Sequence, residues 1–276
     1  MKAQMQNLFK QYYKTSRYSI QKIAILILLL HLALGSQAQN ASYGQVCNEL
    51  QFARAINDKW AGEVFIGGAF SNTPTDPKLL STNIQRYFML WAHYYYSPRW
   101  KFSSSFAYYY NKDVPDIGQY FSPEYRITLQ GTYFFHKIGY ILSTRIRGEI
   151  RVLMNEAGDF EDKYRYRQML KYVKPLNSQV LRQGVFYFVG TEELLLKPQA
   201  KEKGLNFFDR NRVEIGGGYL FTDDLQLELA YLNEFVPRDS GNQIYNALEV
   251  TLTFTNPFPN LKKHLSSLTR SNNKED

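Results

Sequence analysis

Apolar and polar residues alternate with a period of two over much of the chain between residues 60 and 254. The pattern is clearest in residues 100–110, where one face is aromatic and the other is polar or small. The aromatic face carries Trp100, Phe102, Phe106, Tyr108 and Tyr110, and the opposite face carries Lys101, Ser103, Ser105 and Ala107. Such alternation is typical of β-strands, and no apolar stripe with the helical period of about 3.6 residues interrupts it. The pattern therefore predicts an all-β fold.

The alternating segments predict a single antiparallel β-barrel of about ten strands, within a range of roughly 8 to 12. They are residues 60–70, 84–95, 99–110, 122–135, 138–153, 162–174, 184–195, 209–221, 225–236 and 243–254. Most exceed the roughly five or six residues that are usual in soluble sheets. They fit the roughly 9–11 residues that cross a bilayer at a tilt, with some overhang. We therefore expect a transmembrane barrel.

The connections between these segments alternate in length. Long polar connections are expected at residues 71–83, 111–121, 154–161 and 196–208, and tight turns at 97–99, 136–137 and 222–224. Bacterial outer-membrane barrels have the same asymmetry, with short periplasmic turns and longer external loops. The connection at 175–183 breaks the pattern, because it should be short and is not.

Aromatic residues favour the membrane version of the barrel over a soluble, ligand-carrying barrel, which would keep its apolar face inside. Amphipathic rings at both ends of an apolar band are typical of the two headgroup regions. The predicted interface aromatics are Tyr94, Tyr95, Tyr96, Trp100, Tyr108, Tyr110, Tyr140 and Tyr219.

The N-terminus predicts a secretory signal peptide over residues 1–38. It combines five basic residues, a dozen-residue core at 23–34 that is apolar except for His31, and small residues Ser36 and Ala38 before a cleavable bond. The apolar run is too short for a spanning helix, which needs about 20 residues. We then expect a short periplasmic segment at 39–58, the barrel at 59–255 and a polar periplasmic tail at 256–276.

Removal of the signal peptide changes the meaning of the net charge. The full 276-residue chain has a formal charge of +8, with 33 basic and 25 acidic residues. Residues 1–38 hold five of the basic residues and no acidic one, so the exported chain is close to +3. Nucleic-acid binding therefore loses most of its support. Cys47 is the single cysteine, which excludes an internal disulfide.

In a membrane barrel the polar faces of the strands line the lumen. Bases outnumber acids among the charged residues expected there, and a barrel of about ten strands is narrow. We expect either a structural ion-pair network or a constriction that binds or passes anions. The candidate residues are Arg126, Arg145, Arg147, Glu149, Arg151, Arg165, Arg167, Arg212, Glu214, Glu228 and Glu249.

Several of these residues fall in motifs that resemble the domain of unknown function 2490 family. The motifs are Trp60, Arg145-Ile-Arg-Gly-Glu-Ile-Arg151, Tyr164-Arg-Tyr-Arg167, Glu192-Glu193, Asn211-Arg212 and Gly216-Gly-Gly-Tyr219. The resemblance covers about residues 58–254 and implies an outer-membrane barrel of a kind found mainly in Bacteroidetes. It implies no activity, so no catalytic residue can be transferred. The polar tail departs from the aromatic chain terminus that is common in such barrels.

The sequence offers little support for catalysis, metal binding or a cofactor. There is no HExxH motif and no cysteine pair, so we expect no metal site. We expect His93 to share an outward face with Tyr87, Met89 and Trp91, so a triad of His93 with Ser104 or Ser105 has little support. Gly216 to Gly218 lie within a strand and leave room for a bulky lumen side chain.

We therefore expect a protein without catalytic activity in the outer membrane of a Gram-negative cell. Its role would be structural, or that of a narrow anion-preferring pore or ligand-binding barrel. The alternative is an outer-membrane lipid-modifying enzyme of the acyl hydrolase or transferase type. The expected partners are outer-membrane lipids including lipopolysaccharide, and the barrel-assembly machinery during biogenesis, with no nucleic acid. The sequence names no protein partner.

Overall fold

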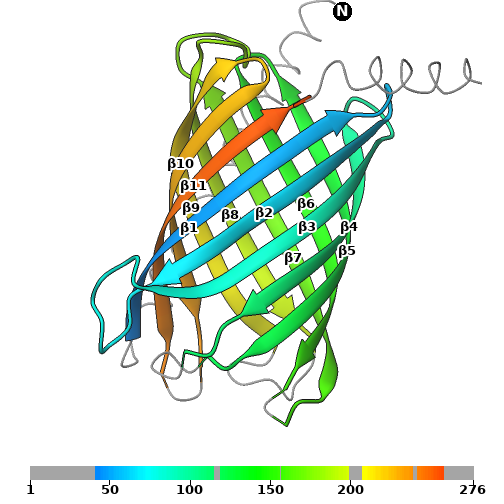
Figure 1. Ribbon diagram of the computed structural model, residues 1–276. Coiled ribbons are helices and arrows are strands. Elements are labelled where there is room, and N and C mark those ends of the chain that lie inside the picture. The colour runs from blue at the N-terminus through cyan, green and yellow to red at the C-terminus, as the bar shows by residue number, and fades with distance from the viewer. Residues whose placement is uncertain (1–40, 115–118, 156, 199–206, 239–240, 258–276) are drawn as a thin grey trace, which may run out of the picture. The chain divides into compact units, whose positions relative to one another are not determined.

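The computed structural model describes residues 41–114, 119–155, 157–198, 207–238 and 241–257 of the chain. These residues form one closed β-barrel of eleven strands (Figure 1). The strands are β1 (Ala41–Ala55), β2 (Trp60–Ser71), β3 (Thr82–Tyr95), β4 (Trp100–Asn111), β5 (Ser122–Lys137), β6 (Tyr140–Met154), β7 (Phe160–Pro175), β8 (Phe186–Lys197), β9 (Phe207–Thr222), β10 (Leu225–Val236) and β11 (Gln243–Thr255). The prediction of an all-β barrel of about ten strands is confirmed.

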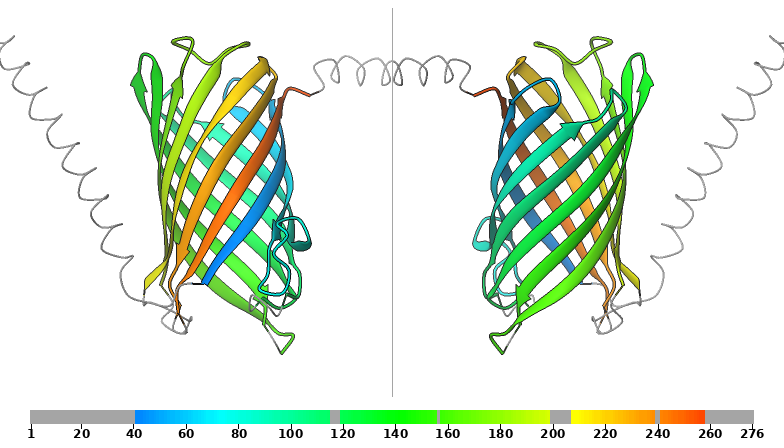
Figure 2. Two further views of the ribbon diagram at one scale, coloured as in Figure 1. Left: turned by 90° about the vertical axis from the view of Figure 1, so that its left-hand side faces the viewer. Right: turned by 90° about the vertical axis from the view of Figure 1, so that its right-hand side faces the viewer.

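Each strand pairs with its neighbours in the sequence, and the first and last strands close the barrel (Figure 1). Because the number of strands is odd, β1 and β11 run in the same direction, and this pair is parallel, with Ala41 opposite Gln243. All other pairs are antiparallel. The strands are strongly tilted in both side views (Figure 2), as closure of a barrel requires.

Strand β1 corrects the expected domain boundaries. Residues 39–58 were expected to be a periplasmic segment, but residues 41–55 form a full strand of the barrel wall. Its apolar alternation is weak, because Gly44 and Asn48 interrupt the face that carries Leu50. The extra strand also places Ala41 at the rim of the longer loops, whereas the chain leaves β11 at the rim of the short turns. The signal peptide expected at 1–38 and most of the tail expected at 256–276 lie outside the described residues.

The connections differ at the two rims, as the sequence predicts. Residues 56–59, 96–99, 138–139 and 223–224 make short turns at one rim. The exception expected near 175–183 is present as the connection 176–185. Its Asn177 side chain donates to the Gly184 carbonyl, and the Gln183 N–H donates to Asp223 of the neighbouring turn, so this longer connection is tied to the rim.

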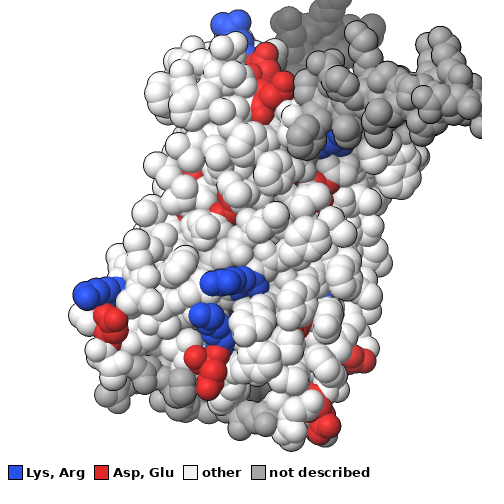
Figure 3. Space-filling view, in the orientation of Figure 1, with Lys and Arg blue, Asp and Glu red and all other residues white. Residues whose placement is uncertain are grey.

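The wall has an apolar exterior and a polar interior. Outward side chains in the middle of β5 and β6 are largely exposed, with Leu129 and Ile146 both at 67%. Their inward neighbours are buried, with Thr128 at 3% and Glu149 at 4%. Charged side chains are sparse on the face in Figure 3 and gather mainly toward its lower end. This arrangement is the inverse of a soluble protein and is typical of barrels that span a membrane.

No helix among the described residues is long and apolar enough to span a membrane.

Candidate functional site

The interior of the barrel holds a cavity of about 900 Å³, which is the candidate functional site. It is lined by inward residues of nearly every strand, because alternate positions along each strand point into the lumen. Most of its charged side chains form ion pairs with one another. The eight arginines of this ion-pair network are Arg126, Arg145, Arg147, Arg151, Arg165, Arg167, Arg210 and Arg212, and its five carboxylates are Glu124, Glu149, Glu193, Asp209 and Glu234.

Glu124 on β5 is one centre of the network. Its carboxylate accepts hydrogen bonds from Arg126 on the same strand and from Arg151 on β6, with Arg151 Nη2 at 2.9 Å. The Arg126 guanidinium also lies 3.6 Å above the ring of Tyr109. The Glu124 side chain is 1% exposed, so its charge depends almost entirely on these two arginines.

Arg167 on β7 joins two further carboxylates. It donates to Glu149 Oε1 at 2.9 Å and to Glu193 Oε2 at 2.5 Å. Arg145 also pairs with Glu193, while Arg147 donates twice to the Gln130 side chain, at 2.9 and 2.7 Å. Arg145 Nε and Glu149 Oε2 are buried without a hydrogen bond, although Arg165 lies 3.9 Å from the latter atom.

A β-bulge completes the network on β9. Leu195 faces Arg210 but Leu196 faces Phe208, so Asp209 has no partner in the ladder. A bulge breaks strict alternation, and both Asp209 and Arg210 consequently join the network. Asp209 accepts from Arg210 and lies 3.2 Å from Arg165 Nη2. Arg210 also donates to Glu234 at 2.7 Å.

Other lumen carboxylates are held by hydroxyl groups instead of arginines. Tyr87 donates to Glu49 and Tyr187 donates to Glu228, each at 2.6 Å. Each tyrosine ring lies over a glycine of the neighbouring strand, where a Cβ would come within 2.4 Å of the Tyr87 ring or 2.2 Å of the Tyr187 ring. The latter glycine is Gly218, so the expected bulky residue over the glycine run is Tyr187.

The predicted lumen residues fall into two groups. The structure brings Arg126, Arg145, Arg147, Glu149, Arg151, Arg165, Arg167 and Arg212 into the ion-pair network. The remaining three lie outside it. Glu214 accepts from Thr191, Glu228 accepts from Tyr187, and Glu249 lines the cavity.

Sequence reasoning missed six charges that line the cavity or join the network: Glu49, Glu63, Glu193, Asp209, Arg210 and Arg238. Glu49 and Glu63 were missed because their strands alternate weakly, and Asp209 because it sits in the bulge. Four of the six are acidic, so the excess of bases among the lumen charges is smaller than expected. The excess is concentrated in the ion-pair network, with eight arginines against five carboxylates.

The sequence pattern predicted that His93 lies on the outer face, and this prediction is wrong. The His93 side chain points into the barrel, and the residue is 4% exposed. Tyr87, Met89 and Trp91 on the same strand also line the cavity. Both faces of β3 are rich in apolar residues, so alternation alone cannot tell which face points inward.

The predicted interface aromatics lie mostly on the outer face. Tyr96 and Trp100 are 66% and 41% exposed, and Trp100 stacks on Phe102. Outward ring pairs also include Tyr94 with Trp60, Tyr108 with Tyr125, Tyr110 with Phe121, Tyr140 with Tyr172, and Tyr219 with Phe186. Tyr95 differs, because it shares the inward face of β3, and Lys101 Nζ lies 5.9 Å from its ring centroid.

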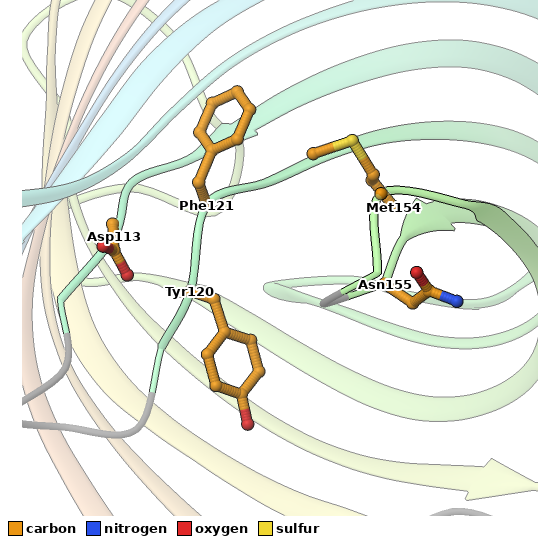
Figure 4. Close-up of a pocket in the computed structure, with 6 residues that line it drawn as sticks. Asp113, Tyr120, Phe121, Met154 and Asn155 are labelled. Carbon is orange, nitrogen blue, oxygen red and sulfur yellow. The ribbon is translucent and has the colours of Figure 1, made fainter.

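A smaller pocket of about 360 Å³ lies at the rim of the long loops. Figure 4 shows its labelled residues, which come from the loop after β4, the end of β6 and the loop that follows β6. They include Asp113, Tyr120 and Asn155, without a cluster of like charge. Among the described residues, no three His, Cys, Asp or Glu side chains are grouped to hold a metal ion.

Comparisons with known proteins found solved structures and one family model that resemble the chain. The chain is similar to a solved structure titled bacterial polysaccharide outer membrane secretin, with a TM-score of 0.48 and 12% identity. The match covers 72% of this chain and 66% of the secretin chain, so it spans just under two thirds of the secretin. It is also similar to LpxR from Salmonella typhimurium, with a TM-score of 0.46 and 8% identity over 74% of this chain and 86% of that one. No curated protein matches the chain. A family model described as a protein of unknown function, DUF2490, matches residues 45–245, which is more than half of the sequence, and the chain therefore belongs to the DUF2490 family.

Proposed function

We propose that the protein is an outer-membrane barrel of a Gram-negative cell. The exposed apolar belt supports this proposal, because such a surface is stable only against lipid acyl chains or another apolar surface. Outer-membrane lipids including lipopolysaccharide would then contact the outward aromatic residues. A barrel of this type would depend on the barrel-assembly machinery for insertion.

We further propose that the lumen is a narrow passage or binding site that prefers small anions. The observation that carries this proposal is the ion-pair network, in which eight arginines face five carboxylates beside the 900 Å³ cavity. Guanidinium groups that carboxylates do not fully neutralise attract anions, and a narrow lumen of low dielectric strengthens that attraction. Arg145 and Arg147 line the cavity and each contacts at most two acceptor side chains.

Planar-bilayer recording of the purified, folded protein tests this proposal. In a potassium chloride gradient, the reversal potential is expected to show preference for chloride. Replacement of Arg145 or Arg147 by Gln should move the reversal potential toward potassium. Lys59→Gln is the matched control, because it removes one charge from an exposed turn and leaves the lumen unchanged.

Two results would contradict the proposal. Preference for potassium in the natural protein would overturn the selectivity. No conductance from protein that shows the heat-modifiable gel mobility of a folded barrel would exclude the pore. A closed barrel that binds anions without passing them, or a structural barrel, would then remain.

A further inference from the structure

Three side chains on adjacent strands form a continuous hydrogen-bonded chain inside the barrel. Glu63 comes from β2, His93 from β3 and Ser103 from β4, all near the rim of the short turns. His93 Nε2 lies 2.8 Å from Glu63 Oε2, and His93 Nδ1 lies 2.8 Å from Ser103 Oγ. The order carboxylate, imidazole, hydroxyl is that of a serine nucleophile with its base and orienting acid.

With His93 neutral, as a general base must be, the chemistry of the three groups sets the direction of these hydrogen bonds. An ionised carboxylate can only accept, so His93 Nε2 carries the proton and donates to Glu63. Nδ1 then has a free lone pair, and Ser103 donates its hydroxyl proton to it. The imidazole is therefore held as a base toward Ser103 in the tautomer that nucleophilic catalysis requires.

A positive charge lies two strands away from Ser103, on the same side of the barrel wall. In the sheet, Ser103 faces Gln130 on β5, and Gln130 faces Arg147 on β6. The Arg147 guanidinium lies 5.0 Å above the ring of Trp91, which stacks on His93 with ring centroids 5.9 Å apart. A guanidinium near the nucleophile can stabilise an oxyanion in a site of low dielectric.

The carboxylate and the imidazole of this chain line the lumen cavity. Glu63, His93, Gln130 and Arg147 all line the 900 Å³ cavity. Ser103 is 6% exposed, and its hydroxyl lies one hydrogen bond from an imidazole that lines the cavity. Lys101 and Arg145 line the cavity as well, so this end of it is basic.

We propose that Ser103, His93 and Glu63 form a serine acyl-hydrolase site inside the lumen, with an anionic ester as substrate. Ser103 is the nucleophile, His93 the general base and Glu63 the group that orients His93. Arg145, Arg147 and Lys101 select an ester that also carries a carboxylate or phosphate. This activity goes beyond the proposed passage of anions and does not depend on it.

The reaction balances with water as the only co-reactant. Ser103 Oγ adds to the ester carbonyl carbon while its proton moves to His93 Nδ1. The tetrahedral intermediate then expels the alkoxide, which takes that proton and leaves as an alcohol. Water, deprotonated by His93, attacks the acyl-serine, and the carboxylic acid departs as Ser103 regains its proton.

Covalent labelling of the full-length protein in detergent micelles tests the site. Diisopropyl fluorophosphate is a small probe that phosphorylates an activated serine, and mass spectrometry of the digested protein locates the label. Labelling is expected at Ser103. It should be lost in Ser103→Ala and His93→Gln and kept in Ser105→Ala, which is the matched control because Ser105 is an inward, buried residue of the same strand.

Hydrolysis of mono-(4-nitrophenyl) succinate, a small anionic ester, gives an independent readout. Ser103→Ala and Glu63→Gln should each lower kcat by about 10³-fold or more. Ser105→Ala should leave kcat within about twofold, since no step of the proposed reaction uses its hydroxyl. Arg147→Gln should raise the KM for this ester more than that for neutral 4-nitrophenyl acetate.

Labelling of the natural protein needs no variant, so the test holds even if a variant fails to fold. Absence of label at Ser103 in folded natural protein would overturn the proposal. Equal labelling or equal hydrolysis in natural protein and in folded Ser103→Ala would overturn it as well. In that case His93 would be a buried histidine with a structural role.

Discussion

Two parts of the barrel interior satisfy their charges in different ways. In the ion-pair network, which runs from β5 to β10, carboxylates such as Glu124 and Glu149 are surrounded by arginines. Elsewhere in the lumen, Glu49 on β1 and Glu228 on β10 accept from tyrosine hydroxyls whose rings lie over glycines. We call the first part the arginine wall and the second the tyrosine wall.

This difference in partners indicates which part of the lumen would respond to the charge of a bound ligand. In the arginine wall a carboxylate is ionised and shared, and removal of one partner leaves a buried charge without compensation. In the tyrosine wall each carboxylate accepts a hydrogen bond from a neutral hydroxyl group. The position of that hydroxyl depends on the packing of the tyrosine ring against a glycine, which has no side chain. We therefore expect the arginine wall to act on a ligand through its charge. We expect the tyrosine wall to contribute through the packing and shape of its side chains.

The largest effect is expected from Glu124→Gln. This change leaves Arg126 and Arg151 buried without a countercharge and should lower the free energy of unfolding by about 3–5 kcal/mol. Urea unfolding of the barrel in lipid vesicles, followed by tryptophan fluorescence, measures the effect.

Glu214→Gln is the control for this change, because within the described part of the chain the Glu214 carboxylate accepts a side-chain hydrogen bond only from the neutral Thr191. It should cost no more than about 1 kcal/mol. Equal losses for the two variants would mean that the arginine wall holds no special electrostatic energy.

A smaller effect is expected from Gly218→Ala in the tyrosine wall. The new Cβ would lie 2.2 Å from the Tyr187 ring, which must move, at a cost of about 1–3 kcal/mol. Addition of Tyr187→Ala should remove this cost, so that the two changes are not additive.

Gly148→Ala provides the matched comparison, because no atom lies within 4 Å of the new Cβ. Its unfolding midpoint in urea should equal that of the natural protein. If Gly218→Ala were equally neutral, the ring would not be packed on the glycine.

The smallest effect is expected from Tyr87→Phe. Glu49 loses the tyrosine hydroxyl but still accepts from Gln51 at 2.6 Å, so the expected cost is about 1 kcal/mol. Tyr108→Phe, on the outer face, should cost less in the same urea titration. A loss as large as that of Glu124→Gln would remove the distinction between the two walls.

The fold could be predicted from strands in which only one face is apolar. Residues 225–236 alternate leucine with glutamine and glutamate, and β10 has those bounds. The sequence of β1 was not recognised because its outward face is broken by glycine and asparagine. Because β1 was not recognised, the parallel pairing of β1 with β11 that closes the barrel could not be predicted either.

The candidate site was predicted less completely, for two physical reasons. Alternation locates charges such as Arg145 and Arg147, but it fails at the bulge that turns Asp209 toward the network. On β3 the inward face of Met89 and Trp91 is as apolar as the outward face, so hydropathy carries no information on direction. The hydrogen-bonded chain through His93 depends on that direction and therefore required the structure.

The most direct test of the account is the accessibility of two adjacent residues on β3. Met89 lines the cavity, whereas Leu90 is 44% exposed on the outer face. In a Cys47→Ser background, Met89→Cys and Leu90→Cys are folded into lipid vesicles and treated with a water-soluble or a lipid-soluble thiol reagent. The account predicts that the water-soluble reagent labels the cysteine at 89 and the lipid-soluble reagent labels that at 90. The reverse result would contradict an ionic lumen inside an apolar wall.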